Sequence, residues 1–257
     1  MKHGFIGFGN LGKAIYQGLK DNKGHSFAYA SKSNLHTGIK SFGNLSQLTS
    51  FADVIWLCIQ PQNLIEVLTQ LKSINLKDKV IVSPVAGKSI SVIENYVGKN
   101  VTIVRIMPNL AVAYKKSVTA YCTNNKQAKL FKSVKKNLMT LGKVVELPER
   151  HFDLFTAIFG SGPAFLLTIL QALKNKISEL GISDREANDL LIELIIGTIT
   201  YFKENCTQKS IDNLIKDITS KGGTTEAGLN YLRKNNLDQL FEKVILEAQK
   251  KSKEIDK

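Results

Sequence analysis

The stretch Lys2-His3-Gly4-Phe5-Ile6-Gly7-Phe8-Gly9-Asn10-Leu11-Gly12 decides the fold of the first half of this chain. Its apolar residues predict a strand over residues 2–8, and a helical pattern follows over residues 11–22. In the turn between them, Gly7 permits a tight bend, Gly9 lets the backbone approach a pyrophosphate, and Gly12 lets helix and strand pack closely. The pattern therefore predicts a dinucleotide site formed by Gly7, Phe8, Gly9, Asn10, Leu11 and Gly12.

Strand and helix patterns alternate through the first half of the chain. Short apolar runs of the kind that form buried strands recur at residues 26–31, 54–59, 80–85, 101–107, 118–122 and 144–147. Helical patterns fill most of the gaps, at residues 45–52, 62–74, 90–97 and 126–141. This alternation is typical of α/β proteins and predicts a Rossmann-type, doubly wound sheet, largely parallel, with helices on both faces. The pattern leaves the order of the last strands open.

The pattern changes near residue 150. After Pro148 no further strand is expected, and helices are expected at about residues 163–180, 183–205, 210–218, 225–235 and 237–253. Ser183 and Glu186 form a capping-box pattern, which predicts Ser183 as the N-cap of the second of these helices. The charge changes at the same place, because residues 1–150 hold 21 lysines and arginines against 7 acids, a net +14. Residues 151–257 hold 14 against 15, a net −1. We therefore expect a dinucleotide-binding domain over residues 1–150 and an all-α domain over residues 151–257.

The segment at residues 190–202 is apolar almost all round, unlike the one-sided pattern of a surface helix. The helical half of the chain offers little room to hide such a helix completely. We therefore expect it to pack against a second copy in an obligate homodimer of interleaved helices. Full burial against neighbouring helices of the same chain is the alternative.

Composition argues against several classes of protein. With 43% hydrophobic and 22% charged residues, the chain is typical of globular proteins. The net charge of +13 includes lysines at helical spacing over residues 126–136, which indicates a solvated helix face rather than a nucleic-acid site. Residues 190–202 are too few to span a bilayer, so membrane insertion is not expected. The first residues form a strand pattern without the apolar region of a signal peptide, so secretion is not expected either. Three widely spaced cysteines, Cys58, Cys122 and Cys206, predict buried, reduced thiols in a cytoplasmic protein, and no metal site is expected.

The end of the second expected strand bears on the choice of dinucleotide. An NAD-specific site usually has an Asp or Glu there that hydrogen-bonds the adenosine ribose, but no acidic residue occurs between Asp21 and Asp53. Ser31, Lys32 and Ser33 stand there instead and suit a 2′-phosphate. NADPH is therefore the expected cofactor, and NADH is the alternative. Lys32 could instead be an ordinary lysine of a surface loop.

Two further turns follow expected strands, at Pro61-Gln62 and at Ala86-Gly87. Ligands of doubly wound sheets lie beyond the carboxyl ends of the strands, so both turns are candidates for contact with the nicotinamide ribose and ring. An ordinary helix start and an ordinary turn are the alternative interpretations.

The second half carries one distinctive corner, Thr219-Ser220-Lys221-Gly222-Gly223-Thr224-Thr225. Its two adjacent glycines allow a tight turn and the close approach of a ligand, and a helix is expected from about Thr225. The unpaired N–H groups and positive dipole end of that helix would suit a small carboxylate. Helix capping by the threonines, without a ligand, is the alternative.

Taken in order, these motifs resemble those of the pyrroline-5-carboxylate reductases. The resemblance spans nearly the whole chain and also includes Arg105-Ile106-Met107-Pro108-Asn109 and Gly160-Ser161-Gly162-Pro163-Ala164-Phe165. It implies NAD(P)H-dependent reduction of the cyclic imine 1-pyrroline-5-carboxylate to L-proline, the last step of proline biosynthesis. It further implies a helical dimerisation and substrate-binding domain, and homodimers that often assemble into rings.

The resemblance also assigns roles to particular residues. The N–H groups of residues 223–225 would hold the substrate carboxylate. The Thr225 hydroxyl would bond the ring nitrogen and assist its protonation, which makes Thr225 the expected catalytic residue. Asn109 joins the expected cofactor contacts. Substrate contacts are expected at Ser220, Gly222, Gly223, Thr224 and Thr225.

Several residues depart from the family pattern. Lys221 and Ala111 stand where proline is usual, Lys115 and Ser117 stand where glycine is usual, and Gln60 stands where a lysine commonly precedes Pro-Gln. These changes put the geometry of the loops in doubt, and with it the substrate range or the turnover.

Two other functions therefore stay open. One is a related imine or β-hydroxyacid oxidoreductase, which would usually place a catalytic lysine in the first long helix after the sheet domain. The first lysine of that helix is Lys174, late in its expected length. The other is an NADPH-binding regulatory paralogue with weakened catalysis.

Overall fold

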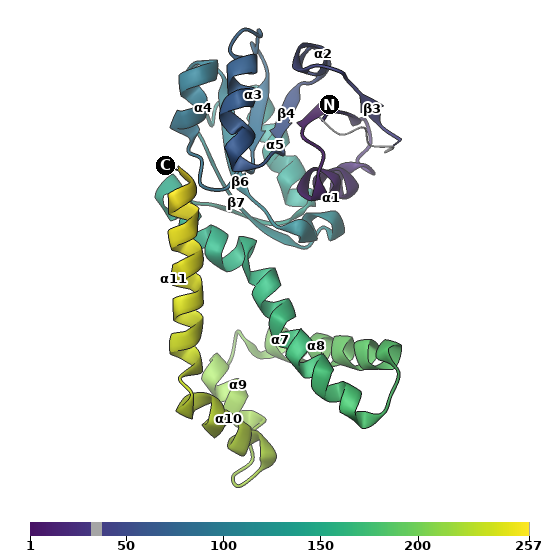
Figure 1. Ribbon diagram of the computed structural model, residues 1–257, viewed down its shortest axis with the longest axis vertical. Coiled ribbons are helices and arrows are strands. Elements are labelled where there is room, and N and C mark those ends of the chain that lie inside the picture. Colours follow the sequence, from purple (N-terminus) through teal and green to yellow (C-terminus); the bar gives the residue numbers. More distant parts are fainter. Residues whose placement is uncertain (32–37, 257) are drawn as a thin grey trace. The chain divides into compact units, whose positions relative to one another are not determined.

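The computed structural model of the chain describes residues 1–31 and 38–256 (Figure 1). Its internal contacts divide it into two compact units. The first unit, here called the sheet unit, combines residues 1–161 with the chain from Ile245 onward. The second, the helical unit, is Gly162–Val244. The division into domains at residue 150 stays a prediction.

The described part of the sheet unit contains one eight-stranded sheet. Its strands are β1 (Lys2–Ile6), β2 (Ser26–Ala30), β3 (Lys40–Ser41), β4 (Val54–Leu57), β5 (Val80–Ser83), β6 (Thr102–Met107), β7 (Ser117–Thr123) and β8 (Gly142–Glu146). They lie side by side in the order β3-β2-β1-β4-β5-β6-β7-β8. All neighbours run parallel except β6 and β7, which are antiparallel. The predicted α/β class with a largely parallel sheet is confirmed.

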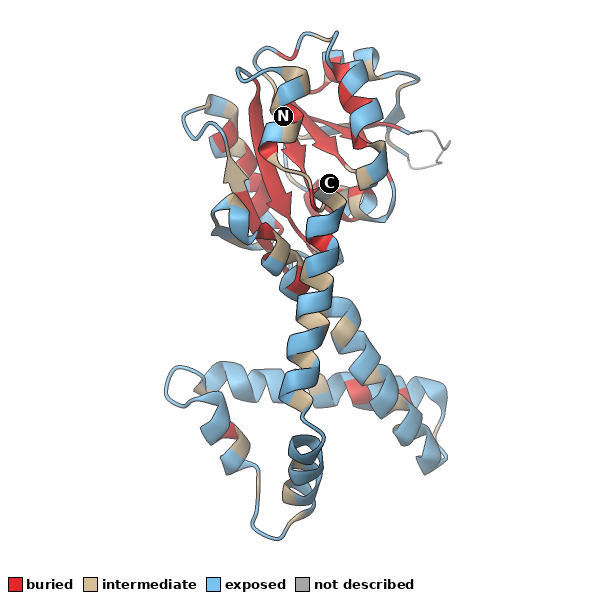
Figure 2. Cartoon of the chain, turned by 60° about the vertical axis from the view of Figure 1, so that its left-hand side comes forward, coloured by how far each residue is buried: buried red, intermediate tan, exposed pale blue. Residues whose placement is uncertain are grey.

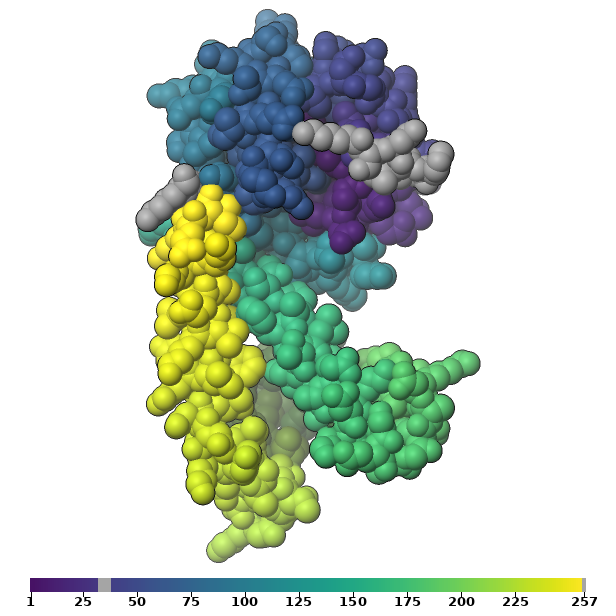
Figure 3. Space-filling view, viewed as in Figure 1, coloured from purple at the N-terminus to yellow at the C-terminus, as the bar shows by residue number. Residues whose placement is uncertain are grey.

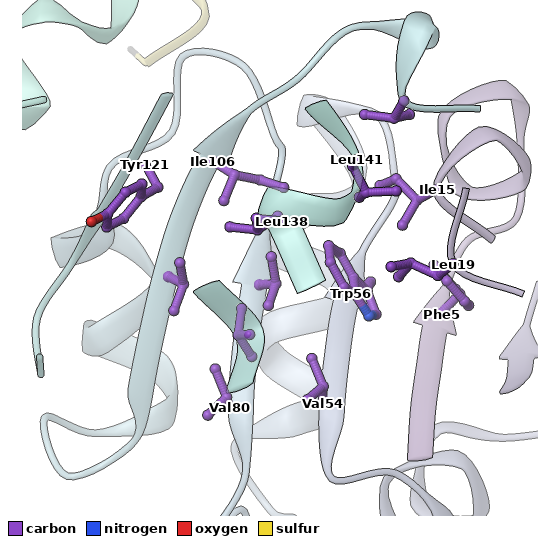
Figure 4. Packing of buried hydrophobic residues seen from close by; sticks show 14 of the residues in the cluster. Phe5, Ile15, Leu19, Val54, Trp56, Val80, Ile106, Tyr121, Leu138 and Leu141 are labelled. Atoms are coloured by element: carbon purple, nitrogen blue, oxygen red, sulfur yellow. The ribbon is translucent and has the colours of Figure 1, made fainter. Parts of the chain in front are cut away.

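Helices cover both faces of this sheet, because successive side chains of each strand point to opposite sides. Helices α1 (Asn10–Leu19) and α5 (Lys129–Thr140) pack on one face. Helices α2 (Leu45–Phe51), α3 (Leu64–Leu71) and α4 (Ile90–Val97) pack on the other. Figure 4 shows Phe5 and Trp56 of the strands against Ile15 of α1 and Leu138 of α5. Each fully buried side chain of this kind contributes roughly 1.5–3 kcal/mol to stability.

The boundaries differ from the prediction where short elements intervene. Strand β1 ends at Ile6 rather than at residue 8, because Gly7 takes φ +80° and turns the chain. Sequence did not predict β3, the 3-10 helix η2 (Leu110–Tyr114), or α6 (Phe152–Phe155) with the π-helical turn Thr156–Gly160 after it. These elements are too short for a helical or strand period to show in sequence.

The helical unit contains α7 (Gly162–Ile177), α8 (Asp184–Asn205), α9 (Ile211–Asp217), α10 (Thr224–Lys234) and the first turns of α11 (Leu237–Asp256). The predicted cap of α8 is present, since Glu186 N donates to Ser183 Oγ at 3.2 Å. Gly181 takes φ +74° before it, in the left-handed region that commonly ends a helix. The predicted helices of this half are therefore all present.

Little of the helical unit is buried by its own chain. Within residues 162–244, all of them described, only Ala187, Leu191 and Leu214 are buried (Figure 2). Large apolar side chains of α8 are more than half exposed, among them Leu190 at 51% and Ile196 at 54%. The alternative that neighbouring helices of the same chain bury α8 is therefore wrong.

One helical run, Glu149–Leu180, is long and apolar enough to cross a membrane by length and composition. Its first turns belong to the sheet unit, where Phe152 and Phe155 are buried in a cluster with Met107 and Ala120. A position in a bilayer would withdraw both phenylalanines from that cluster. The absence of membrane insertion stays a prediction that this packing favours.

Candidate active site

A hollow of about 530 Å³ lies at the carboxyl ends of β1, β2 and β4. Gly7, Phe8 and Gly9 line it from the turn after β1, Ser31 lines it after β2, and Gln60 lines it after β4. In doubly wound sheets this edge is where ligands bind. The hollow therefore has the position expected of a dinucleotide site.

The geometry of the turn after β1 explains each of its glycines. A Cβ on Gly7 would stand 2.4 Å from Cys58 O, and φ is +80°. A Cβ on Gly12 would lie 3.2 Å from Gly7 O, so α1 packs closely on the turn. By contrast, no described atom lies within 4 Å of a Cβ placed on Gly9. Gly9 therefore borders open space, as expected where a ligand approaches the backbone.

Helix α1 begins with Gly9 as its N-cap, and no side chain caps it. The first bond of its backbone ladder joins Lys13 N to Gly9 O at 2.9 Å. Among the described residues, the N–H groups of Asn10, Leu11 and Gly12 therefore have no acceptor. Three such groups at the positive end of a helix dipole form an anion site that fits a pyrophosphate.

The structure adds three residues to this site that sequence did not single out. Phe42, Gly43 and Asn44 line the hollow, and Asn44 caps α2 by accepting from Gln47 N at 2.9 Å. A capping asparagine before a helical pattern is a readable signal. Strand β3, which brings this loop to the sheet edge, has only two residues and gave no signal.

The expected contacts for the 2′-phosphate are only partly described. Ser31 lines the hollow, whereas Lys32 and Ser33 lie outside the described residues. Their role in binding the cofactor stays a prediction.

The two turns expected near the nicotinamide lie apart from the lining of the hollow. Pro61 and Gln62 belong to the 3-10 helix η1 (Pro61–Asn63), and the hollow is lined by the residues on either side of them. Gly87 has φ +66°, and a Cβ there would stand 2.6 Å from Ser252 O. The Ala86-Gly87 turn therefore packs against the last turns of α11, which Figure 3 shows in yellow.

Asn109 is held by three hydrogen bonds within the sheet unit. Its N–H donates to Ser117 Oγ at 3.2 Å, its Oδ1 accepts from Ala111 N at 3.0 Å, and its Nδ2 donates to Phe159 O at 2.8 Å. Two of these bonds need the residues that depart from the family pattern, because proline has no N–H and glycine has no hydroxyl. Lys115 takes φ +59°, where glycine is favoured. The altered loop is thus fixed by its own residues.

The corner in the helical unit is a β-turn followed by α10. Gly223 N donates to Ser220 O at 3.0 Å, and Gly222 has φ +73°. Helix α10 begins with Gly223 as N-cap and without a side-chain cap. Its first backbone bond joins Ala227 N to Gly223 O at 3.1 Å.

This geometry changes the expected set of donors at the corner. The Gly223 N–H is used inside the turn, so it is not available to a ligand. Among the described residues, the N–H groups of Thr224, Thr225 and Glu226 have no acceptor. The Ser220 hydroxyl lies beside them, since a Cβ on Gly223 would come within 2.5 Å of Ser220 Oγ. The corner thus offers three N–H groups and one hydroxyl.

Helices α1 and α10 share a feature that sets them apart. Each begins at a glycine and leaves its first N–H groups without a side-chain acceptor. Four other helices, α2, α4, α8 and α9, are capped by the side chains of Asn44, Ser89, Ser183 and Ser210. Helices α3, α5 and α6 also lack a side-chain cap, but their N-caps are not glycines. The glycine N-caps of α1 and α10 both lie at corners for which sequence predicted a ligand.

The three cysteines are free, but Cys58 and Cys122 are only half-buried and Cys206 is exposed, so the expectation of three buried thiols is met only in part. Burial raises the pKa of the Cys58 thiol far above its usual value and raises that of Cys122 to about 12. Cys206 is exposed, which corrects the expectation, because it follows the poorly covered α8. Among the described residues, no group of three His, Cys, Asp or Glu side chains could hold a metal ion.

The sequence matches two known protein families. Residues 149–255 match the family of pyrroline-5-carboxylate reductase dimerisation regions, and residues 2–87 match the coenzyme F420-dependent NADP oxidoreductases. The pyrroline-5-carboxylate reductase of Aquifex aeolicus is 32% identical over 263 residues, which cover 99% of this chain and 97% of that protein. The chain belongs to the pyrroline-5-carboxylate reductase family. The resemblance noted from its motifs is confirmed.

Solved structures of pyrroline-5-carboxylate reductases share the whole fold. The enzyme of Plasmodium falciparum with NADP bound has a TM-score of 0.92 and 27% identity, covering 100% of this chain and 98% of that one. The enzyme of Streptococcus pyogenes has a TM-score of 0.89 and 28% identity, covering 99% and 98%. The predicted order, a sheet domain followed by a helical dimerisation region, is that of the family.

Proposed function

We propose that this protein reduces 1-pyrroline-5-carboxylate to L-proline with NADPH. The observation that carries the proposal is the start of α10, where three successive N–H groups and the Ser220 hydroxyl can meet one small carboxylate. Family membership over nearly the whole chain supplies the reaction class. The substrate of that class carries a single carboxylate on a five-membered imine ring.

The residues of the sheet unit fit a dinucleotide. Open space at Gly9 and the uncapped start of α1 suit the pyrophosphate, and Ser31 with Lys32 and Ser33 would take the 2′-phosphate. When bound, the nicotinamide supplies the hydride. The remaining cofactor contacts proposed on the family pattern are Pro61, Gln62, Ala86, Gly87 and Asn109.

The corner at α10 would promote hydride transfer mainly by holding the imine in the correct orientation. A protonated ring nitrogen already makes the imine carbon, C2 of the pyrroline ring, electrophilic. As the hydride forms the new C–H bond at this carbon, the π electrons of the C=N bond move to nitrogen and give the secondary amine. The N–H groups of Thr224 and Thr225 would fix the carboxylate, and the Thr225 hydroxyl would bond the ring nitrogen and assist its protonation.

A homodimer fits the exposed face of α8 and the dimerisation region matched over residues 149–255. We further propose that the dimers can assemble into rings, as the family resemblance implies. A cytoplasmic location is proposed on the three free cysteines, which suit a reducing compartment. Neither nucleic acid nor a membrane is a proposed partner.

The rival functions have less support. A β-hydroxyacid oxidoreductase would need a lysine available early in α7, whereas the Nζ of Lys174, the first lysine of α7, pairs with Asp184 Oδ2 at 3.1 Å. A regulatory paralogue was suggested by the altered loop, yet Ala111 and Ser117 hold that loop by hydrogen bonds of their own. Both observations favour an active reductase.

Turnover of the purified protein tests the proposal. We expect NADPH oxidation, followed at 340 nm, with 1-pyrroline-5-carboxylate and not with acyclic keto acids. Turnover only with other imines or keto acids would support the rival oxidoreductase. Tight NADPH binding without turnover would support the regulatory paralogue.

The cofactor preference has its own test. We expect kcat/KM to favour NADPH over NADH, and Lys32→Ala to reduce that ratio by weakening the contact with the 2′-phosphate. Lys40→Ala, on the neighbouring strand, is the control. Equal use of the two cofactors, unchanged by Lys32→Ala, would contradict the assignment.

A further inference from the structure

The turn before α10 is only half specified by its own sequence. Its bond from Gly223 N to Ser220 O places Lys221 second and Gly222 third in a four-residue turn. The φ of Gly222 is +73°, and Lys221 is not among the residues with positive φ, which is the pattern of a type II turn. Glycine is favoured at the third position and proline at the second. Lys221, unlike proline, leaves its own φ unrestricted, so a further contact would stabilise the turn.

A side chain of α10 supplies that contact. Glu226 Oε2 accepts a hydrogen bond from Gly222 N at 2.7 Å. Glu226 is the third residue of the helix, the position from which a carboxylate reaches back over the helix start. A hydrogen bond to an ionised acceptor is about twice as strong as a neutral one. It ties the middle of the turn to the helix whose N–H groups form the anion corner.

We propose that Glu226 is a positioning residue for the substrate. It holds the turn so that the Ser220 hydroxyl and the N–H groups of Thr224 and Thr225 converge on one carboxylate. The inference rests on the proposed function, because it concerns the binding of the same imine. The bond from Glu226 uses the Gly222 N–H and leaves the three N–H groups of the helix start unpaired.

The acceptor and the charge of Glu226 act on substrate binding in opposite directions. As an acceptor, the carboxylate orders the turn. As a charge, it is stabilised by the helix start but repels a second carboxylate bound nearby. Glutamine in its place keeps an acceptor and loses the charge, whereas alanine loses both. The two substitutions therefore separate the two effects.

The experiment compares KM for 1-pyrroline-5-carboxylate in Glu226→Ala, Glu226→Gln and the wild type. Loss of one hydrogen bond to a charged group should raise KM about tenfold in Glu226→Ala, with KM for NADPH unchanged. Glu226→Gln should have the wild-type KM or a lower one. Glu186→Ala is the matched control, because Glu186 is the third residue of α8 and should leave KM for the imine unchanged.

A rescue variant tests the mechanism directly. Proline at position 221 would fix the φ that a type II turn needs, and Lys221 N donates no hydrogen bond to a described residue. Lys221→Pro added to Glu226→Ala should therefore recover most of the lost affinity for the imine. Amide hydrogen exchange by NMR should be slow at Gly222 in the wild type and fast in Glu226→Ala and in Lys221→Pro with Glu226→Ala, because both lack an acceptor at position 226.

The outcomes distinguish this inference from the proposed function. No turnover by the wild type would contradict the function, while the Gly222 exchange rates would still test the contact. An active wild type with unchanged KM in Glu226→Ala would overturn the inference alone. A raised KM in Glu226→Gln, or no recovery in Lys221→Pro with Glu226→Ala, would overturn it as well.

Discussion

The sheet unit and the helical unit differ in how much of their structure one chain completes. In the sheet unit, Phe5 and Trp56 are fully buried between the sheet and the helices α1 and α5, and residues of one chain line the hollow. In the helical unit only three residues are buried, and Ile196 is 54% exposed. The cofactor end of the proposed reaction is thus built within a single copy. The helical unit, which carries the proposed substrate corner, has an exposed apolar surface that a partner would bury. The match to a dimerisation region indicates that this partner is a second copy of the chain.

Of the changes considered, a charge introduced on the exposed face of α8 is expected to have the largest effect on dimerisation and turnover. Ile196→Glu should dissociate the dimer and lower turnover at least about a hundredfold, because an unpaired buried charge costs several kcal/mol. NADPH binding to the sheet unit should persist. Light scattering gives the mass, and fluorescence titration gives the cofactor affinity.

The control for this variant is Lys203→Glu, which places the same charge at an exposed polar position of α8. It should stay dimeric and active. A dimeric, fully active Ile196→Glu protein would contradict the assignment of this face to the partner.

Acid should weaken the sheet unit through His3. Its Nδ1 accepts from Trp56 Nε1 at 3.1 Å, so neutral His3 carries its proton on Nε2 and donates it to His25 Nδ1, 2.9 Å away. Burial lowers the pKa of His3 to about 3 from 6.5. As the pH falls, His3 is protonated in the unfolded chain at a higher pH than in the folded protein. The free energy of unfolding is therefore greatest above pH 6.5 and falls as the pH drops toward 3. The loss is at most roughly 5 kcal/mol.

Urea unfolding followed by Trp56 fluorescence measures this effect, since Trp56 is the single tryptophan and lies in the sheet unit. His3→Gln keeps an acceptor for Trp56 and should flatten the change in stability between pH 7 and pH 4. His151→Gln, at an exposed position, should keep the wild-type slope. An unchanged slope in His3→Gln would rule out His3 as the source.

Thr225→Ala should lower kcat about a hundredfold, in the range that a positioned proton-transfer partner contributes. Stability and NADPH affinity should change little, because Thr225 is exposed in the single chain. Thr224→Ala is the control, since the proposal uses only the backbone of Thr224. Wild-type kcat in Thr225→Ala would contradict the catalytic role.

Gly87→Ala should have the smallest effect and should separate backbone strain from packing. At Gly87 a Cβ would lie 2.6 Å from Ser252 O, and the φ of +66° is itself unfavourable for alanine. At Gly24 φ is +76°, but no described atom lies within 4 Å of a Cβ. Both variants should lose about 1 kcal/mol from the backbone, and Gly87→Ala should lose more.

The proposed place of Gly87 near the nicotinamide adds a second readout. Gly87→Ala should raise KM for NADPH, and Gly24→Ala should not. Equal stability and equal KM in the two variants would show that the contact with the end of α11 is unimportant.

Sequence predicted the fold well where local patterns carry it. The Gly-x-Gly-x-x-Gly turn, the strand periods and the Ser183 cap each depend on residues near one another in the chain. The glycine pair at Gly222 marked the second corner for the same reason. The two-residue strand β3 and the short 3-10 helix η2 show no period that could be detected in sequence, and both were missed.

Contacts between distant segments account for most of the other differences. Asn44 reaches the hollow through β3, and Asn109 bonds to Phe159, 50 residues away. Sequence predicted that the Gly223 N–H binds the ligand, but this N–H closes the turn by donating to Ser220 O. The turn depends on the positive φ of Gly222, and a glycine can adopt that φ but need not do so. The exposure of Cys206 reflects a helix that its own chain leaves uncovered.

A crystal structure with NADP and a five-membered-ring carboxylate that mimics proline tests the central claim most directly. The account predicts the dinucleotide in the hollow beside Gly9. It predicts the carboxylate of the mimic within hydrogen-bond distance of the N–H groups of Thr224 and Thr225. A mimic bound away from residues 220–226 would contradict it.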